Sequence, residues 1–133
     1  MRRLPAHVES AVRAAKLLAA PWRGVATAKS TGPRGMNKLE AAWAEVLRER
    51  EIRGEVLWWR YEGISVRLAN GAWYTPDFAV VVDGGEMECH ECKGFMREAA
   101  HVRLKVAAET FPMRFVLVRR EKGAWAAEEV ARR

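Results

Sequence analysis

The stretch that most constrains the fold is residues 73–94, which reads WYTPDFAVVVDGGEMECHECKG. Two runs rich in aromatic and β-branched residues flank the Asp-Gly-Gly turn at 83–85, a pattern typical of a β-hairpin. If those three residues form the loop, Val82 pairs with Glu86, and the register of the whole hairpin is set. The sequence therefore predicts two antiparallel strands whose cross-strand neighbours can be counted.

Charged residues stand in this hairpin at positions that a half-buried strand normally avoids. Asp77 precedes the apolar run 78–82, and the predicted register places it opposite Glu91, with Cβ atoms about 4.5–5.5 Å apart. Lys93 should lie on the same face as Glu91, because strand side chains alternate. Two carboxylates that close repel each other unless a cation lies between them, and oxygen ligands suit Mg²⁺ or Mn²⁺. The three residues therefore predict a metal site.

Pro76-Asp77, followed after the hairpin by Glu91-Cys92-Lys93, resembles the motif of the PD-(D/E)xK nuclease superfamily. The longer strings Tyr-Thr-Pro-Asp-Phe and Glu-Cys-Lys-Gly-Phe are similar to a phage-associated family of Holliday-junction resolvases. The resemblance covers roughly residues 36–123. It implies that Mg²⁺, or Mn²⁺ in its place, is held by Asp77, Glu91 and the backbone carbonyl of Cys92. Lys93 would orient or deprotonate the attacking water, or stabilise the charge of the transition state.

In this superfamily the first helix contributes an acid to the metal site, and Glu40 matches that position. The resemblance implies that Glu40 binds the ion directly or through a water. The sequence alone also allows another interpretation, because a glutamate three residues after Asn37 is the second member of a capping box. Glu45 lies on the same predicted helix.

Apolar periodicity and chain-breaking residues predict an α/β fold with the order α-β-β-β-α-β, preceded by an arm. This order is also that of the restriction-endonuclease-like core, which has a mixed central sheet. The predicted elements are a helix over 6–20, a loop over 21–35, a helix over 37–53, strand runs over 56–61 and 64–68 that form one long strand bent near Gly63, an Asn70-Gly71 turn, the hairpin, a helix over 95–110 and a strand over 113–118. Residues 123–133 have no clear pattern, and a short terminal helix is one interpretation.

Two apolar stripes indicate how the later helices should pack. The inner face of the helix over 37–53 is predicted to carry Leu39, Trp43, Val46, Leu47 and Arg50. The inner face of the helix over 95–110 is predicted to carry Phe95, Ala99, Val102 and Val106.

The net charge of +6 is concentrated at the N-terminus. Residues 1–35 hold seven Lys or Arg and one acid, whereas residues 36–133 hold sixteen charges of each sign. We therefore expect a basic arm, 1–35, on a nuclease domain, 36–133, and an acidic polymer as the partner. A basic tail that only aids solubility is the alternative. The residues expected to contact phosphates are Lys29, Arg34, Lys38, Arg97 and Lys105.

No run approaches the roughly 18 apolar residues of a membrane span, and 17–21 is too short for a signal peptide core. We expect a soluble intracellular protein, in the cytoplasm of the host if a phage encodes it. Cys89 and Cys92 with His90 between them look like half a zinc site. Residues three apart on a strand face opposite ways, so we expect neither zinc nor a disulfide there.

The expected function is that of a metal-dependent, structure-selective DNA endonuclease acting on four-way junctions. A repair or end-processing nuclease on flap or linear DNA, and a non-catalytic DNA-binding module, are the alternatives. Resolution needs two symmetric nicks, so we expect a homodimer. Apolar surface for it is predicted from Trp58, Trp59, Trp73 and Phe115. Trp58 and Trp59 are adjacent on a strand, so one of them should face away from the core. That tryptophan could instead stack on an unpaired base or pack under the arm.

Overall fold

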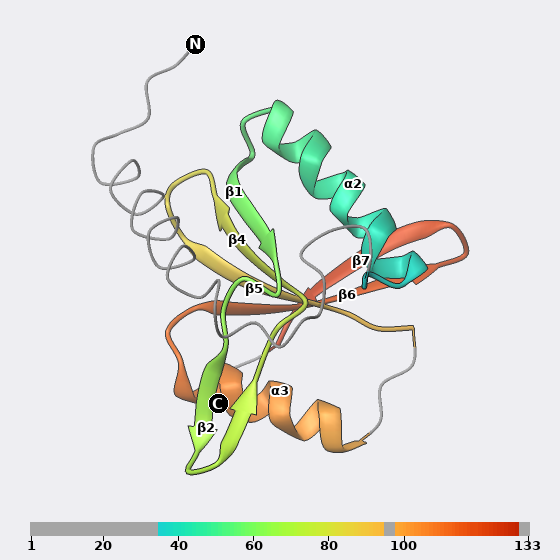
Figure 1. Ribbon diagram of the computed structural model, residues 1–133. Coiled ribbons are helices and arrows are strands. Elements are labelled where there is room, and N and C mark those ends of the chain that lie inside the picture. The colour runs from blue at the N-terminus through green and yellow to red at the C-terminus, as the bar shows by residue number, and fades with distance from the viewer. Residues whose placement is uncertain (1–34, 95–97, 131–133) are drawn as a thin grey trace.

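A computed structural model describes residues 35–94 and 98–130, which form an α/β fold (Figure 1). Residues 1–34 of the predicted arm, with its helix over 6–20, lie outside these residues. In chain order the elements are α2 (Lys38–Ile52), β1 (Val56–Tyr61), β2 (Val66–Ala69), β3 (Ala72–Tyr74), β4 (Phe78–Val82), β5 (Met87–Cys92), α3 (Glu98–Thr110), β6 (Arg114–Glu121) and β7 (Ala124–Glu129). Neither of these two helices has the length and apolarity that crossing a membrane requires.

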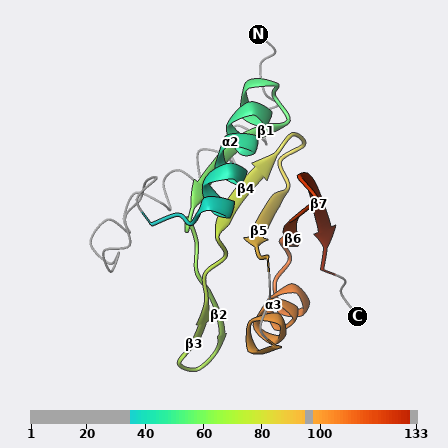
Figure 2. The same cartoon turned by 90° about the vertical axis from the view of Figure 1, so that its right-hand side faces the viewer.

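The described strands form one five-stranded sheet, in the order β1-β4-β5-β6-β7, and a separate two-stranded sheet of β2 and β3. The large sheet is mixed: β5 and β6 run parallel, whereas its other neighbouring pairs are antiparallel. Helix α3 makes the crossover from β5 to β6, as a parallel pair requires. Figures 1 and 2 show α2 alongside β1 and the β2–β3 hairpin alongside α3.

The core has two layers because the residues of the central strands alternate between the faces of the sheet. On β6, Val116 and Val118 pack into the cluster that contains Trp43 and Leu47 of α2. Phe115 and Leu117 of the same strand face the other way and belong to a second cluster. Its other members are Val66, Tyr74, Cys89, Leu104, Ala107 and Ala108. The sheet is therefore covered by α2 on one face and by α3 with the small hairpin on the other.

The register of the β4–β5 hairpin is confirmed. The N–H of Val82 donates to the carbonyl of Glu86 at 3.0 Å, and Phe78 pairs with His90. One further step along each strand brings Asp77 level with Glu91. The length of the turn at 83–85 therefore determines which residues face each other at the far end of the hairpin.

Asn37 is the N-cap of α2, as predicted, but the reciprocal bond of a capping box has another donor: Glu40 accepts from the side-chain amide of Asn37 rather than from its backbone N–H. Asn37 Oδ1 accepts the N–H of Glu40 at 2.8 Å, and Asn37 Nδ2 donates to Glu40 Oε1 at 2.8 Å. This pair of bonds satisfies an orphan amide of the first turn and holds the glutamate side chain over it.

The prediction of one long strand over 56–68 is wrong. Strand β1 ends at Tyr61, and β2 belongs to the other sheet. Between them Glu62 adopts a left-handed conformation (φ 48°), and its N–H donates to the carbonyl of Asp77 at 2.7 Å. A Cβ at Gly63 would lie 3.0 Å from Cβ of Arg60, so the chain turns too tightly there for a continuous strand.

The C-terminal segment forms a strand and not a helix. Strand β7 pairs with β6 through a two-residue turn, Lys122-Gly123, in which both residues have positive φ (50° and 80°). Such a turn matches the twist of a hairpin. The open edge of β6 therefore determines the conformation of residues that have no strand pattern of their own.

The predicted inner face of α3 is wrong as well. Val102 is 52% exposed and Val106 is 37% exposed, whereas Leu104, Ala107 and Ala108 are buried. Both stripes have helical spacing, and the stripe of Leu104, Ala107 and Ala108 is the one that packs against the sheet. Phe95 lies outside the described residues.

Most of the aromatic surface expected for a dimer is buried within the chain. Trp58 and Phe115 are both in the core, and Trp59 packs partly buried on the α2 side. Trp73, at 55% exposure, remains on the surface. The expectation of an apolar face built from Trp58 and Phe115 is therefore wrong.

Candidate active site

Asp77 and Glu91 lie side by side where β4 begins and β5 ends. The register that pairs Phe78 with His90 brings the two acids level. Asp77 Oδ2 accepts the backbone N–H of Cys92 at 2.8 Å, so the aspartate is fixed to the neighbouring strand. The predicted juxtaposition of these two carboxylates is present in the structure.

Glu91 is held from two directions. Its Oε2 accepts the hydroxyl of Tyr74 at 2.7 Å, and its Oε1 lies 3.7 Å from Nζ of Lys93. Glu91 is only 7% exposed, whereas the Lys93 side chain is 35% exposed. Lys93 therefore reaches from solvent to the buried carboxylate on the face that strand alternation predicts.

The electrostatics of the pair are unfavourable in the absence of a cation. Burial raises the pKa of Asp77 to about 7, and repulsion from Glu91 adds to the rise. The Cys92 N–H and Lys93 oppose it only in part. Burial also raises the pKa of Glu91, against the hydrogen bond from Tyr74 and the charge of Lys93. Two such carboxylates would gain from a nearby positive ion.

Glu40 approaches this pair from α2. It is 7% exposed, and its Oε2 accepts the hydroxyl of Tyr61 at 2.7 Å. Its charge raises the pKa of both Asp77 and Glu91, so it acts on the same site. Both interpretations of Glu40 thus have support: it completes the cap of α2, and it adds to the negative potential of the pair.

Tyr61 and Tyr74 are site residues that the sequence did not single out. Each donates its hydroxyl to one of the acids. Burial, followed by the neighbouring carboxylates, raises the pKa of both phenols. Tyr74 stands in the motif stretch, but only tertiary packing shows that its hydroxyl reaches Glu91.

The donor chemistry fits a hard divalent ion. Asp77 and Glu91 offer carboxylate oxygens, and Cys92 follows with a backbone carbonyl, the ligand types that Mg²⁺ and Mn²⁺ prefer. Among residues 35–94 and 98–130, no three His, Cys, Asp or Glu side chains form a metal-binding group. Strand alternation places Asp77 with Ala79 and Val81, whereas Glu40 is bound to Tyr61, which packs on the α2 side. The candidate metal ligands are therefore Asp77, Glu91 and the carbonyl of Cys92, and Glu40 lies on the α2 side of them.

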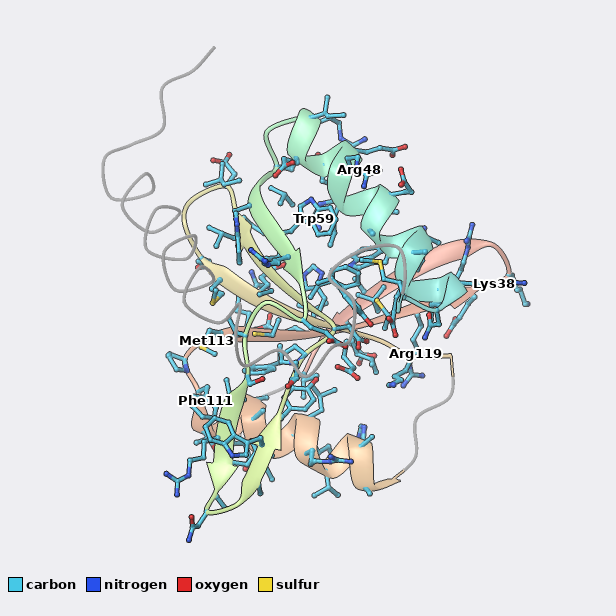
Figure 3. All side chains as sticks on the ribbon, viewed as in Figure 1. Lys38, Arg48, Trp59, Phe111, Met113 and Arg119 are labelled. Atoms are coloured by element: carbon cyan, nitrogen blue, oxygen red, sulfur yellow. The ribbon has the colours of Figure 1, made fainter. Side chains whose placement is uncertain are left out.

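The structure describes two of the five basic residues that were expected to contact phosphates. Lys38 and Lys105 are exposed, while Lys29, Arg34 and Arg97 lie outside the described residues. Arg119 was not predicted. The N–H of Lys93 donates to the carbonyl of Val118 at 3.1 Å, so Arg119 comes next to Lys93 on the parallel strand. Lys38 and Arg119 both project outward on the side where α2 begins (Figure 3).

Behind the carboxylates, a buried polar chain joins α2 to β5. Trp43 Nε1 donates to His90 Nδ1 at 3.0 Å, and His90 Nε2 lies 2.8 Å from Glu88 Oε1. An indole nitrogen can only donate, so Nδ1 accepts and Nε2 carries the proton shared with Glu88. His90 therefore has a structural task.

The two cysteines are free and belong to different cores. Cys89 packs in the cluster of α3, and Cys92 packs in the cluster of α2. This separation follows from the odd spacing of the two residues along one strand.

Comparisons with protein-family models, with curated proteins and with solved structures find no match to this chain.

Proposed function

We propose that this protein is a metal-dependent, structure-selective DNA endonuclease, with four-way junctions as its preferred substrate. The observation that carries the proposal is the pairing of the half-buried Asp77 with the buried Glu91, level across neighbouring strands, with Lys93 beside them. The order of elements agrees with it. When the β2–β3 hairpin is set aside, α2, β1, β4, β5, α3 and β6 follow the α-β-β-β-α-β order of the PD-(D/E)xK core.

Each side chain has a task in phosphodiester hydrolysis. Asp77, Glu91 and the Cys92 carbonyl would hold a divalent ion, which when bound supplies a more acidic water and neutralises charge on the phosphate. Tyr74 fixes one oxygen of Glu91 and leaves the other toward Lys93. Lys93 would orient the attacking water or stabilise the charge that develops on the phosphate.

Glu40 has a supporting task in this scheme. Its two hydrogen bonds, from Asn37 and Tyr61, hold the carboxylate in place at the edge of the site. From there it strengthens the negative potential that attracts the ion, directly or through a water.

The second candidate is a single-site repair nuclease that acts on flap or linear DNA. The burial of Trp58 and Phe115 favours it, because it removes apolar surface from the expected dimer interface. A resolvase needs two sites related by a two-fold axis, and a C₂ homodimer supplies them. Light scattering on the DNA-free protein separates the candidates: a dimer supports the resolvase, and a monomer of 15.1 kDa supports the repair nuclease.

Cleavage of matched substrates tests the proposal. Four-way junction, flap and linear duplex DNA are incubated with Mg²⁺, Mn²⁺ or Ca²⁺. We expect cleavage of the junction with Mg²⁺ or Mn²⁺ and none with Ca²⁺, which coordinates more loosely. Asp77→Asn, Glu91→Gln and Lys93→Ala should each abolish cleavage while DNA binding persists.

Asp83→Asn is the matched control, because Asp83 is an exposed carboxylate in the turn of the same hairpin. It should cleave like the unmodified protein. Cleavage at a normal rate by any of the three site variants would refute the assigned roles. DNA binding without cleavage under every condition would leave a non-catalytic binding module.

A further inference from the structure

The hairpin of β2 and β3 has no part in the chemistry proposed above, yet it is tightly joined to the site. It forms its own sheet and extends past the end of the large one (Figures 1 and 2). Strand β3 ends at Tyr74, whose hydroxyl binds Glu91, and the chain reaches Asp77 three residues later. Any molecule bound to this hairpin therefore has a fixed position relative to both carboxylates.

The two faces of the hairpin differ in character. Val66 and Tyr74 face inward and pack with Leu104 of α3. The opposite face carries Arg67 and Trp73, which are cross-strand partners, and both are exposed. An indole at 55% exposure thus lies opposite an exposed arginine on the outside of the hairpin.

The outer face is polar and pre-ordered around this indole. Arg67 is held by the carbonyl of Ala69 at 3.4 Å and by Asn70 Oδ1 at 2.8 Å. The hydroxyls of Ser65 and Thr75 lie 2.6 Å apart next to it. These bonds restrain the side chains before any partner arrives, which reduces the entropy lost on binding.

The charge of this segment suits an anionic partner. Residues 63–76 contain one arginine and no acid, in a chain whose residues are 30% charged. Arginine, hydroxyl and amide groups are common contacts to the DNA backbone. A protein partner would favour a contiguous apolar patch, whereas Trp73 stands among polar side chains.

We propose that the outer face of the β2–β3 hairpin binds the DNA strand next to the cleavage position, where Trp73 stacks on an unpaired base and Arg67 contacts a neighbouring phosphate. This inference rests on the proposed endonuclease function and adds the feature recognised in the substrate. A base within a duplex is covered on both sides by its neighbours. An exposed indole can therefore stack only where pairing is interrupted, as at a branch point or flap.

Binding without cleavage tests the inference. Fluorescence anisotropy in EDTA compares a duplex that contains a three-nucleotide unpaired segment with a fully paired duplex of equal length. The full chain should prefer the unpaired substrate. Trp73→Ala should weaken binding to that substrate about tenfold, and Trp73→Phe should keep most of the affinity, because an aromatic ring remains.

Two further variants sharpen the result. Arg67→Ala should weaken binding to both substrates and lower the salt dependence by about one phosphate contact. Ile52→Ala should change neither affinity, because Ile52 is 81% exposed but lies at the end of α2 remote from the hairpin (Figure 1).

Three outcomes would overturn the inference: no preference for unpaired DNA, unchanged binding by Trp73→Ala, or conversion of a dimer to a monomer by that variant. The last would identify the face as a self-association surface. If the unmodified protein cleaves DNA with Mg²⁺ while Trp73→Ala binds normally, only this inference fails. If it neither binds nor cleaves DNA, the proposed function fails with it.

Discussion

Tyr74 and Glu91 belong to different sheets, yet the hydroxyl of Tyr74 donates to Oε2 of Glu91 at 2.7 Å. Both residues are buried. Burial, and after it the charge of Glu91, raises the pKa of the phenol, which keeps it a hydrogen-bond donor. The bond leaves Glu91 Oε1 on the side of Lys93. A hydroxyl from the small hairpin thus helps to orient a central carboxylate.

Tyr74→Phe removes this hydroxyl and keeps the ring. We expect about a tenfold rise in the Mg²⁺ concentration for half-maximal cleavage, because bonds that orient a metal ligand affect metal affinity by roughly that factor or more. The rate at saturating Mg²⁺ should fall less. A Mg²⁺ titration measures both values, and Trp73→Phe is the control on the adjacent residue. Unchanged Mg²⁺ dependence would show that Glu91 does not need Tyr74.

Asp77→Asn should stabilise the metal-free protein at high pH while it abolishes cleavage. The pKa of Asp77 rises from 3.8 to about 7 on folding, chiefly through burial. The stability linked to this group is therefore fully present below about pH 4 and lost as the pH rises through 7. Asp77→Asn should therefore raise the free energy of unfolding more at pH 8 than at pH 4. We expect the two mutational changes to differ by about 1–3 kcal/mol.

Urea unfolding in EDTA at pH 4 and pH 8 measures this difference. Asp83→Asn, at an exposed carboxylate, should show no comparable gain. Added Mg²⁺ should reduce the gain, because it stabilises the unmodified protein in which Asp77 is charged. A gain of equal size at both pH values would show that the charge of Asp77 is not its cause.

Arg119→Ala should weaken DNA binding and leave the chemical step intact. Arg119 is exposed and follows Val118, whose carbonyl accepts the N–H of Lys93. It is therefore placed for a phosphate contact, and its loss should lower the salt slope of binding by about one. Single-turnover cleavage at saturating protein should stay near the normal rate. A rate loss as large as that of Lys93→Ala would move Arg119 into the chemistry.

Trp43→Phe should cost about 2–4 kcal/mol of stability. It leaves the buried Nδ1 of His90 without its donor and opens space between α2 and the sheet. Trp73→Phe, at an exposed position, should stay within about 0.5 kcal/mol. Chemical denaturation compares the two variants. Equal costs would mean that the Trp43–His90 bond contributes little.

Local sequence determined the features that depend on neighbours in the chain. A three-residue turn at 83–85 fixes the hairpin register, because it makes Val82 and Glu86 the first cross-strand pair and every later pair follows one residue at a time. The same counting brings Asp77 level with Glu91. Asn37 caps α2 for the same reason, since its side chain accepts the N–H of Glu40 only three residues along the chain.

Predictions from local sequence were wrong where the same residues allowed two structures. Helix α3 carries two stripes with helical spacing, and contact with the sheet selected Leu104 over Val102. Strand β7 has no strand pattern, and the free edge of β6 supplied the hydrogen bonds that its backbone needs.

The sequence by itself determined the motif, the hairpin register and the side of the strand on which Glu91 and Lys93 lie. Only the tertiary structure decided that Tyr74 reaches Glu91, that Arg119 follows Lys93 on the next strand, and that Trp73 stays exposed while Trp58 is buried. The reason is physical. Register and alternation are properties of a few consecutive bonds, whereas contacts between distant segments depend on how whole layers pack to bury apolar surface.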